Sequence, residues 1–312
     1  MYWTMNRLPV YLTSTLLVCI LLLAGCNVYE GLYEEGASDN PEVLLADGRN
    51  ALQQKRPTEA IDYLRKALEK AEDKPVLRKQ IEIKLATAVL QEYEIDALSF
   101  SRIARNLSGD YAVGKVIASK MQSQTCNFPE HHGRTAFDPR EGIDFERIGS
   151  DAGAEALEEA QTLIARVFTG EETTADPTFP CEEEALDAAV ANLQDEMTHA
   201  EIAEALVNYA IALTTEAYLE IVDAGGNDAS FYYATPPGGA DYIGTCFTDA
   251  QSCEDTIAST AANLSRFDCA TRIFQKRAEL LDSTNAEELA NLAREGYESL
   301  EVSVGTSTCL TY

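Results

Sequence analysis

Residues 41–68 read PEVLLADGRNALQQKRPTEAIDYLRKAL, and this stretch decides the fold. Its apolar side chains recur three or four positions apart, which is the period of an amphipathic α-helix. They are Leu44, Leu45, Ala51 and Leu52, followed by Ala60, Ile61, Leu64, Ala67 and Leu68. The intervening segment Arg56-Pro57-Thr58-Glu59-Ala60 reads as a turn. The stretch therefore predicts two helices packed as a hairpin.

The helical period continues along most of the remaining chain. We expect helices over residues 111–121, 154–168, 182–194, 198–222, 254–281 and 286–302. Thr198-His199-Ala200-Glu201 forms a capping box, in which the threonine and the glutamate satisfy each other's backbone N–H groups. Residues 123–149 and 223–248 lack the period, and the second of these loops contains Phe231-Tyr232-Tyr233. No run of alternating residues is long enough for a sheet, so the prediction is an all-α protein.

The spacing of small residues in the first hairpin resembles that of a tetratricopeptide repeat. Gly48, Ala60, Leu64 and Ala67 fall at the offsets of that family, where small side chains let paired helices approach closely. A weaker second copy consists of Leu85, Ala88, Ala97 and Ala104. The step from Ala60 to Ala97 is 37 residues, against 34 in the family. The resemblance covers residues 41–107, and the alternative is a generic pair of helical hairpins.

The resemblance implies a groove, because the first helices of such repeats line a concave surface that binds peptides or partner helices. In the first repeat it would point Glu42, Leu45, Arg49, Leu52 and Gln53 toward that surface. In the second repeat the corresponding residues are Ala86, Val89 and Leu90. Arg49 and Gln53 are our candidate contact residues. The alternative for all these positions is the core of the domain.

The N-terminus has the form of an export signal. Residues 1–25 contain one charged side chain, Arg7, and an apolar stretch too short to span a bilayer comfortably. The stretch ends in Leu23-Ala24-Gly25-Cys26, which resembles the lipobox of bacterial lipoproteins. That resemblance implies cleavage before Cys26 and acylation of Cys26, and Asn27 resembles the residue found in lipoproteins sorted to the outer membrane. We expect a lipid-anchored protein that faces the periplasm, with residues 26–40 as a flexible tether; a plain or uncleaved signal is the alternative.

The cysteines agree with an exported protein. Removal of Cys19 with the signal and of Cys26 for the lipid leaves an even number, namely Cys126, Cys181, Cys246, Cys253, Cys269 and Cys309. Because exported compartments are oxidising, we expect three disulfides, with connectivity left open among 15 possibilities. Cys246 and Cys253 are the best local pair.

The charge excludes one class of partner and divides the chain. The net charge of −28 argues against a nucleic-acid partner. Between Cys26 and Lys120 there are 14 basic and 16 acidic residues, whereas 9 basic and 36 acidic residues follow from Met121 onward. We therefore expect repeat-like helices over residues 41–123 and an acidic, disulfide-containing helical region over residues 124–312. The acidic surface fits either adaptation to salt or the binding of a cation or basic partner.

Catalytic and metal-binding patterns are weak. The phosphate-binding, dinucleotide-binding and serine-nucleophile motifs are missing from the sequence. His131 and His132, with Cys126 and Glu130 nearby, lack a recognised ligand spacing, and Glu196 with His199 lacks the second pair that a di-iron site needs. Asp223, Asn227 and Asp228 lack the EF-hand order. We expect no cofactor, no metal and no enzymatic activity.

Together these features predict a membrane-anchored periplasmic scaffold or assembly lipoprotein that binds a protein partner in or near the outer membrane. The alternative is a ligand-binding accessory lipoprotein of a tripartite periplasmic uptake system, with a small-molecule ligand. An unrecognised hydrolase is the third possibility.

Overall fold

The structure is a computed structural model of the chain. It describes residues 38–97, 100–101, 145–170, 179–224, 230–234, 242–246 and 250–306. Among these residues the molecule is an array of helices, so the prediction of an all-α fold is confirmed.

The first helices begin at prolines. They are α2 (Pro41–Gln53), α3 (Pro57–Lys70) and α4 (Pro75–Glu92). Proline suits the first turn of a helix because its missing N–H would be unpaired there in any case. The side chain of Asn40 caps α2 by accepting a hydrogen bond of 3.0 Å from the backbone N–H of Glu42. The sequence thus fixes where each of these helices starts.

The later helices lie close to their predicted ranges, except for α7, which lies within residues 123–149, where no helix is predicted. They are α7 (Phe145–Ile148), α8 (Asp151–Thr169), α9 (Glu183–Gln194), α10 (His199–Ala224), α11 (Ala250–Leu281) and α12 (Thr284–Thr306). Gly170 ends α8 in the left-handed conformation, with φ of 69°. The capping box of α10 is confirmed: the N–H of Glu201 donates to Thr198 Oγ1 at 3.3 Å, and the N–H of Thr198 donates to Glu201 Oε2 at 3.0 Å.

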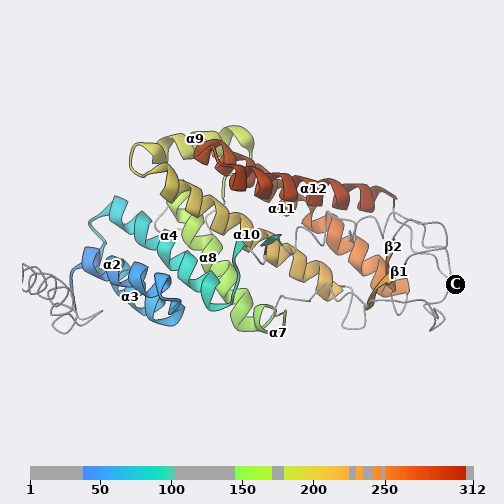
Figure 1. The fold of residues 1–312 in the computed structure, drawn as a ribbon, viewed down its shortest axis with the longest axis horizontal. Helices are drawn as coiled ribbons and strands as arrows, with labels where there is room; N and C mark the ends of the chain where they lie inside the picture. The colour runs from blue at the N-terminus through green and yellow to red at the C-terminus, as the bar shows by residue number, and fades with distance from the viewer. Residues whose placement is uncertain are drawn as a thin grey trace, which may run out of the picture.

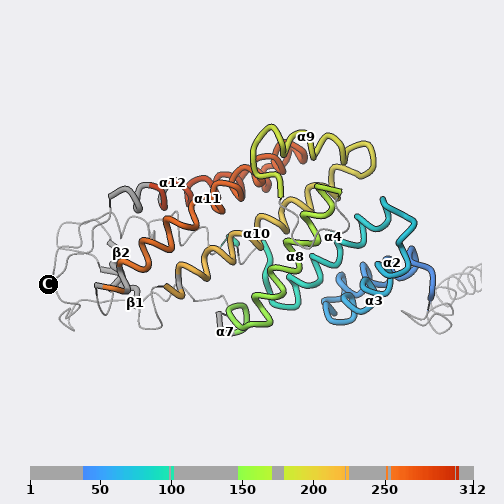
Figure 2. The backbone as a smooth tube through the Cα atoms, turned by 180° about the vertical axis from the view of Figure 1, so that it is seen from behind, coloured from blue at the N-terminus to red at the C-terminus, as the bar shows by residue number. Residues whose placement is uncertain are grey.

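The helices form a stack in which neighbours in the chain are neighbours in space (Figure 1). Contacts run from α2 to α3, α4, α8, α10, α11 and α12 in that order. In addition, α2 contacts α4, and α4 contacts α10. Figures 1 and 2 place α2 and α3 at one end of the molecule and the strands β1 and β2 near the other. The full length of the stack therefore lies between the helices α2 and α3 and the strands β1 and β2.

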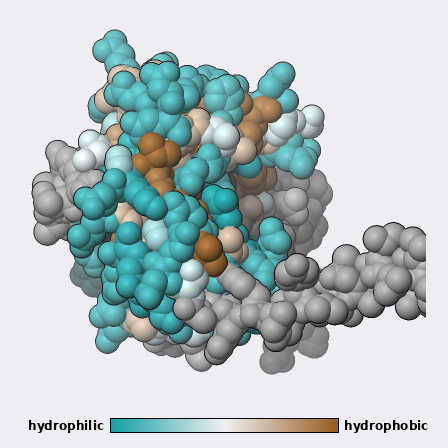
Figure 3. Space-filling model, turned by 90° about the vertical axis from the view of Figure 1, so that its left-hand side faces the viewer, coloured by the Kyte–Doolittle hydropathy of each residue, from teal (hydrophilic) through white to brown (hydrophobic). Residues whose placement is uncertain are grey.

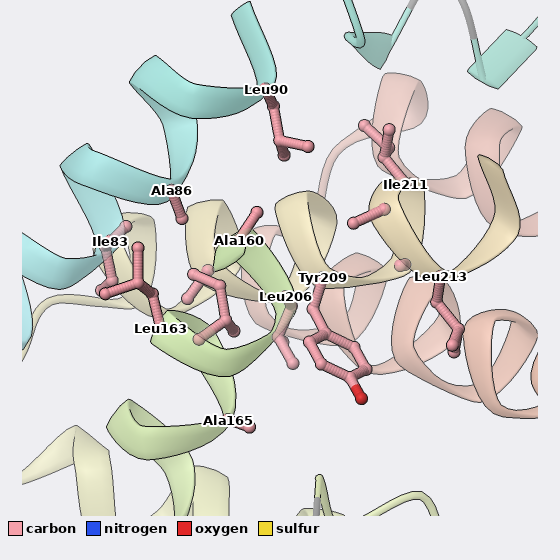
Figure 4. Close-up of a cluster of buried hydrophobic side chains, with 14 of the residues drawn as sticks. Ile83, Ala86, Leu90, Ala160, Leu163, Ala165, Leu206, Tyr209, Ile211 and Leu213 are labelled. Atoms are coloured by element: carbon pink, nitrogen blue, oxygen red, sulfur yellow. The ribbon is translucent and has the colours of Figure 1, made fainter. Parts of the chain in front are cut away.

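One hydrophobic core runs through the stack. Figure 4 shows side chains from α4, α8 and α10 meeting in it, among them Ile83, Leu90, Leu163, Leu206 and Tyr209. The predicted division near residue 123 lies outside the described residues. The helices on either side of that division share this core, because α4 packs directly against α8 and α10.

A small hairpin departs from the expectation of no sheet. Strand β1 (Ser230–Ala234) pairs antiparallel with β2 (Tyr242–Cys246), and Ser230 lies opposite Cys246. Residues Phe231-Tyr232-Tyr233 lie on β1 rather than in an irregular loop. Aromatic residues favour strands, but five residues are too few to give a reliable period.

The first copy of the repeat-like pattern lies wholly within the described residues, and the second only in part. In the first copy, a Cβ at Gly48 would lie 2.6 Å from Leu64 Cγ, so α2 and α3 are as close as the small residue permits. Ala60 is fully buried in that contact, whereas Ala97, its counterpart in the second copy, is exposed. Ala104 lies outside the described residues. Most of the second helix of that copy also lies outside the described residues, and helix α8, from later in the chain, lies against α4.

Candidate protein-binding groove

A groove with a volume of about 420 Å³ lies between α2 and α4. Figure 3 views the molecule from the end at which these helices lie, and it shows a mostly hydrophilic surface interrupted by a few hydrophobic residues. The groove is lined by Glu42, Leu45, Ala46, Arg49, Asn50, Gln53, Leu77 and Gln80. It therefore combines a limited apolar surface with several hydrogen-bonding side chains.

The spacing of residues on α2 explains why it can line a groove and a core at once. Its groove residues recur every three or four positions from Glu42 to Gln53, which places them on one face of the helix. Leu44, Gly48 and Ala51 form a second face, and all of them are buried. Because these faces are distinct, contact with α3 leaves the groove face open.

An ion pair spans the groove at the first turn of α2. Lys74 Nζ lies 2.6 Å from Glu42 Oε1, joining the start of α2 to the residue that precedes α4. The hydrogen bond from Lys74 is the main cause that lowers the pKa of Glu42 below its ordinary value. Glu42 therefore stays charged, with a cation beside it, throughout the neutral range.

Glu201 joins the groove to the start of α10. Its Oε1 accepts a hydrogen bond of 2.9 Å from Gln80 Nε2, and its Oε2 accepts from Thr198. Arg49 Nη2 lies 3.7 Å from Glu201 Oε1, which is close enough for an ion pair but too long for a hydrogen bond. The groove thus has an arginine at its edge whose acidic neighbour is held mainly by other donors.

Lysines of α4 pair with carboxylates on α10 and just before it. Lys79 Nζ lies 2.5 Å from Glu196 Oε2, and Lys84 Nζ lies 2.6 Å from Glu204 Oε1. Thr87 Oγ1 also donates to Glu204 at 3.0 Å. In these pairs the bases belong to the near-neutral first part of the sequence and the acids to the acidic second part. The uneven charge of the sequence therefore supplies complementary partners across this contact.

We expect the protein to become more stable as salt is added. From Met121 onward 36 acids face 9 bases, and their repulsion is long-ranged, whereas ion pairs between exposed groups each contribute little. Molar sodium chloride shortens the screening length to about 3 Å, so it removes the repulsion. Thermal melts at low and at molar salt should show a higher Tm at high salt. Superimposable curves would argue against this expectation.

The structure places both candidate contact residues in the groove: Arg49 and Gln53 lie one turn apart on α2. The expectation for the second repeat was wrong, because Ala86, Val89 and Leu90 are buried in the core. Figure 4 shows Ala86 and Leu90 among side chains of the neighbouring helices. Sequence reasoning missed Leu77 and Gln80, since their place in the groove depends on how α4 sits against α2.

One disulfide between two of the candidate cysteines is present in the described residues. Cys181, just before α9, is bonded to Cys269 in α11, with their Cα atoms 5.1 Å apart. Cys246 lies on β2 and Cys253 on α11, while Cys126 and Cys309 lie outside the described residues. The expectation of three disulfides and the pairing of Cys246 with Cys253 stay predictions.

The remaining candidates from the sequence are the signal, the lipid attachment site and the histidines considered as metal ligands. Residues 1–25, Cys26, His131 and His132 lie outside the described residues. His199 lies in the first turn of α10, with its Nε2 3.4 Å from Gln194 Nε2. Within the described ranges, histidine, cysteine, aspartate and glutamate side chains nowhere gather into a cluster of three suited to a metal ion. None of the helices in those ranges is both long and apolar enough to cross a membrane.

A second, smaller pocket lies between α10, α11 and α12. Its lining includes Thr214, Phe267 and Leu292, and its volume is about 10 Å³. Such a space is about the size of one water molecule. This pocket is therefore too small for a metabolite, and the groove between α2 and α4 is the better candidate site.

Comparison of the chain with protein-family models, with curated proteins and with solved structures finds no match.

Proposed function

We propose that the protein is a lipid-anchored scaffold of the outer membrane that faces the periplasm and binds a partner protein in the groove between α2 and α4. The observation that carries this proposal is the position of the groove, whose first helix starts directly after the predicted tether. The lipobox-like Leu23-Ala24-Gly25-Cys26 supports the anchor, and the lining of Arg49, Gln53 and Leu45 supports a protein partner.

The end of the tether is fixed to the helices. Lys70 Nζ lies 3.0 Å from Asp39 Oδ1, and Asn40 caps α2, so the chain enters the helical stack at a defined place. Residues 26–37 would reach at most about 40 Å even when fully extended. A lipid on Cys26 would therefore keep the groove close to the membrane surface. This arrangement favours a partner that lies in that membrane or at its inner face.

Replacement of Cys26 by alanine is expected to prevent lipid attachment and to release the protein from the membrane fraction. The reason is that the thiol of Cys26 is the proposed attachment site and that each buried methylene contributes about 0.8 kcal/mol to membrane binding. Fractionation and mass spectrometry of the mature N-terminus would measure both effects. Cys19→Ala, within the predicted signal, is the matched control and should leave anchoring intact. A Cys26→Ala protein that remains membrane-bound and is cleaved at the same bond would contradict the anchor.

The groove is tested by the double variant Arg49→Glu with Gln53→Ala. Because a few contact residues usually supply most of the binding energy, we expect crosslinking to the partner in intact cells to weaken about tenfold, equivalent to about 1.4 kcal/mol. Crosslinking followed by quantification of the recovered partner gives the measurement. Melting curves of the purified variant establish that the helices remain folded.

A matched control lies on α12, far along the stack. Arg294→Glu with Asn291→Ala changes the same two residue classes on an exposed surface, where the Arg294 side chain is 50% exposed. It should leave partner recovery unchanged. If the groove variant recovers the partner at full yield, while substitutions at Phe231-Tyr232-Tyr233 abolish recovery, the binding surface lies at the opposite end of the molecule.

A further inference from the structure

Arg49 is held in the groove with unused hydrogen-bonding capacity. Its Nε is buried and has no hydrogen-bond partner among the described residues, and its Nη2 is 3.7 Å from Glu201. The Arg49 side chain as a whole is 40% exposed, so its solvent-accessible surface belongs to atoms other than Nε. A guanidinium carries five N–H donors and binds carboxylates through its fork. Arg49 therefore offers a ligand more donors than its surroundings use.

The acidic neighbour of Arg49 does not depend on it. Glu201 already accepts hydrogen bonds from the backbone N–H and hydroxyl of Thr198, at 3.0 and 2.8 Å, and from Gln80 at 2.9 Å. Its carboxylate stays fixed and hydrogen-bonded if the arginine turns toward a ligand. The positive charge of Arg49 would also remain close to the negative charge of Glu201. Redirection of Arg49 thus breaks no short hydrogen bond.

The other cations around the groove are engaged more closely. Lys74 lies 2.6 Å from Glu42, and Lys79 lies 2.5 Å from Glu196. Each of these lysines already has a carboxylate within hydrogen-bonding distance, which offsets its charge. Among the described residues that line the groove, Arg49 is the one cation, so it is the group there that can meet an incoming acid.

Apolar side chains lie in the same groove as Arg49. Ala46, one turn before Arg49 on α2, is exposed, and the partly buried Leu77 lines the groove from α4, whereas Leu45 beneath them is 4% exposed. Gln53 lies one turn after Arg49 and adds an amide that can pair with a peptide backbone. Along α2 the groove therefore presents an apolar side chain, then a cation, then an amide.

On these grounds, and given the proposed scaffold function, we propose that the groove recognises a partner segment that carries an aspartate or glutamate side chain next to an apolar side chain. The carboxylate pairs with the terminal nitrogens of Arg49, and the apolar side chain lies on Leu77 and the exposed Ala46. Charge complementarity at Arg49 selects the acid, while the apolar contact sets its position. A free C-terminal carboxylate is a different source of the same chemistry and is separated from this one by the test.

The test uses three peptides on the purified, folded protein. Acetyl-Leu-Glu-Leu-amide carries the side-chain acid, acetyl-Leu-Gln-Leu-amide is its neutral counterpart, and acetyl-Leu-Gln-Leu with a free C-terminus carries only a terminal acid. Nuclear magnetic resonance follows the Arg49 Nε–Hε signal and the backbone amides of α2 up to about 10 mM peptide, which detects a Kd near 1 mM. We expect the glutamate peptide to bind about fivefold more tightly than either glutamine peptide, within the range of partly exposed ion pairs.

Two variants assign the preference. Arg49→Gln should make the peptides bind equally, and Arg294→Gln on α12 should leave the preference unchanged. Equal binding to the unaltered protein, a preference that survives Arg49→Gln, tighter binding of the free C-terminus alone, or no shift with any peptide would each overturn the inference.

The two proposals fail separately. If the groove double variant loses the cellular partner while the peptides show no preference, the scaffold function stands and the acidic specificity falls. If the peptides discriminate but the cellular partner is retained by the double variant, the groove binds acids and the scaffold function falls.

Discussion

Replacement of Cys181 and Cys269 by alanine is expected to lower the free energy of unfolding by about 4 kcal/mol. The two cysteines are 88 residues apart, and closing a loop of that length in the unfolded chain gives about 4.6 kcal/mol on the chain-entropy model. Removal of native disulfides from small exported domains gives losses of about 2–5 kcal/mol, which agrees. Urea unfolding of the variant and of the unaltered protein, both without reductant, measures the difference.

A second measurement separates the crosslink from side-chain packing. The single variant Cys181→Ala removes the crosslink and leaves Cys269, which is 4% exposed, in its buried place. It should lose nearly as much stability as the double variant, because the crosslink outweighs the truncation of a small side chain. A loss below about 1 kcal/mol in both variants would show that this disulfide contributes little to stability.

This disulfide acts together with ion pairs at the same contact. Lys276 Nζ lies 2.6 Å from Asp187 Oδ1, and Arg272 Nη1 lies 3.5 Å from Glu182 Oε2, so α9 and the residue before it are joined to α11. Asp187 supplies the main cause that raises the pKa of Lys276 above its ordinary value. Exposed pairs of this kind contribute about 0–1 kcal/mol each. The covalent bond therefore contributes more than these ion pairs to holding α9 against α11.

The helices were predictable because their signals are local. The capping box at Thr198 and Glu201 marks the start of α10, and the apolar period carries through each helix to its end. The pairing of α4 with α8 was not predictable, since a contact between helices far apart in the sequence leaves no local signal in either helix. The partner of Cys181 was also open, because six cysteines allow 15 connectivities and the choice depends on which helices become neighbours.

The same distinction applies to the groove. Arg49 and Gln53 are implied by the resemblance to a tetratricopeptide repeat, and the helical period of α2 agrees, since their face is opposite to that of Gly48 and Leu44. Gln80 lines the groove only because of how α4 is aligned against α2. Glu201 lies beside the groove only because of the position of α10. The open face of one helix can thus be read from its own residues, whereas the groove needs the packing of several.

Replacement of Gly153 by alanine is expected to lower the free energy of unfolding by about 3 kcal/mol, the upper part of the usual range for overpacking. A Cβ at Gly153 would lie 2.1 Å from Ile148 O and 2.7 Å from Arg147 O. Both are backbone atoms, so no side-chain rotation relieves the clash, and α7 would have to move away from the start of α8.

That movement is opposed by the contacts of α7 with the end of α4. Arg147 donates to the backbone carbonyl of Glu92 and lies over the ring of Tyr93, with its Cζ 5.7 Å from the ring centroid. Relief of the clash would therefore break these contacts, or the capping bond of 3.2 Å from the Gly153 N–H to Ser150 Oγ.

Gly170→Ala is the matched control for this substitution. A Cβ there would meet nothing within 4 Å, but φ is 69°, so the expected loss is only about 1 kcal/mol from backbone strain. Urea unfolding of the two variants should thus rank Gly153→Ala well below Gly170→Ala in stability. Alanine also favours a helix over glycine by about 1 kcal/mol, so an unstrained site at residue 153 would be stabilised by the change. A Gly153→Ala protein as stable as the unaltered one would mean that α7 does not press against α8, and that the contact of Arg147 with α4 does not hold it there.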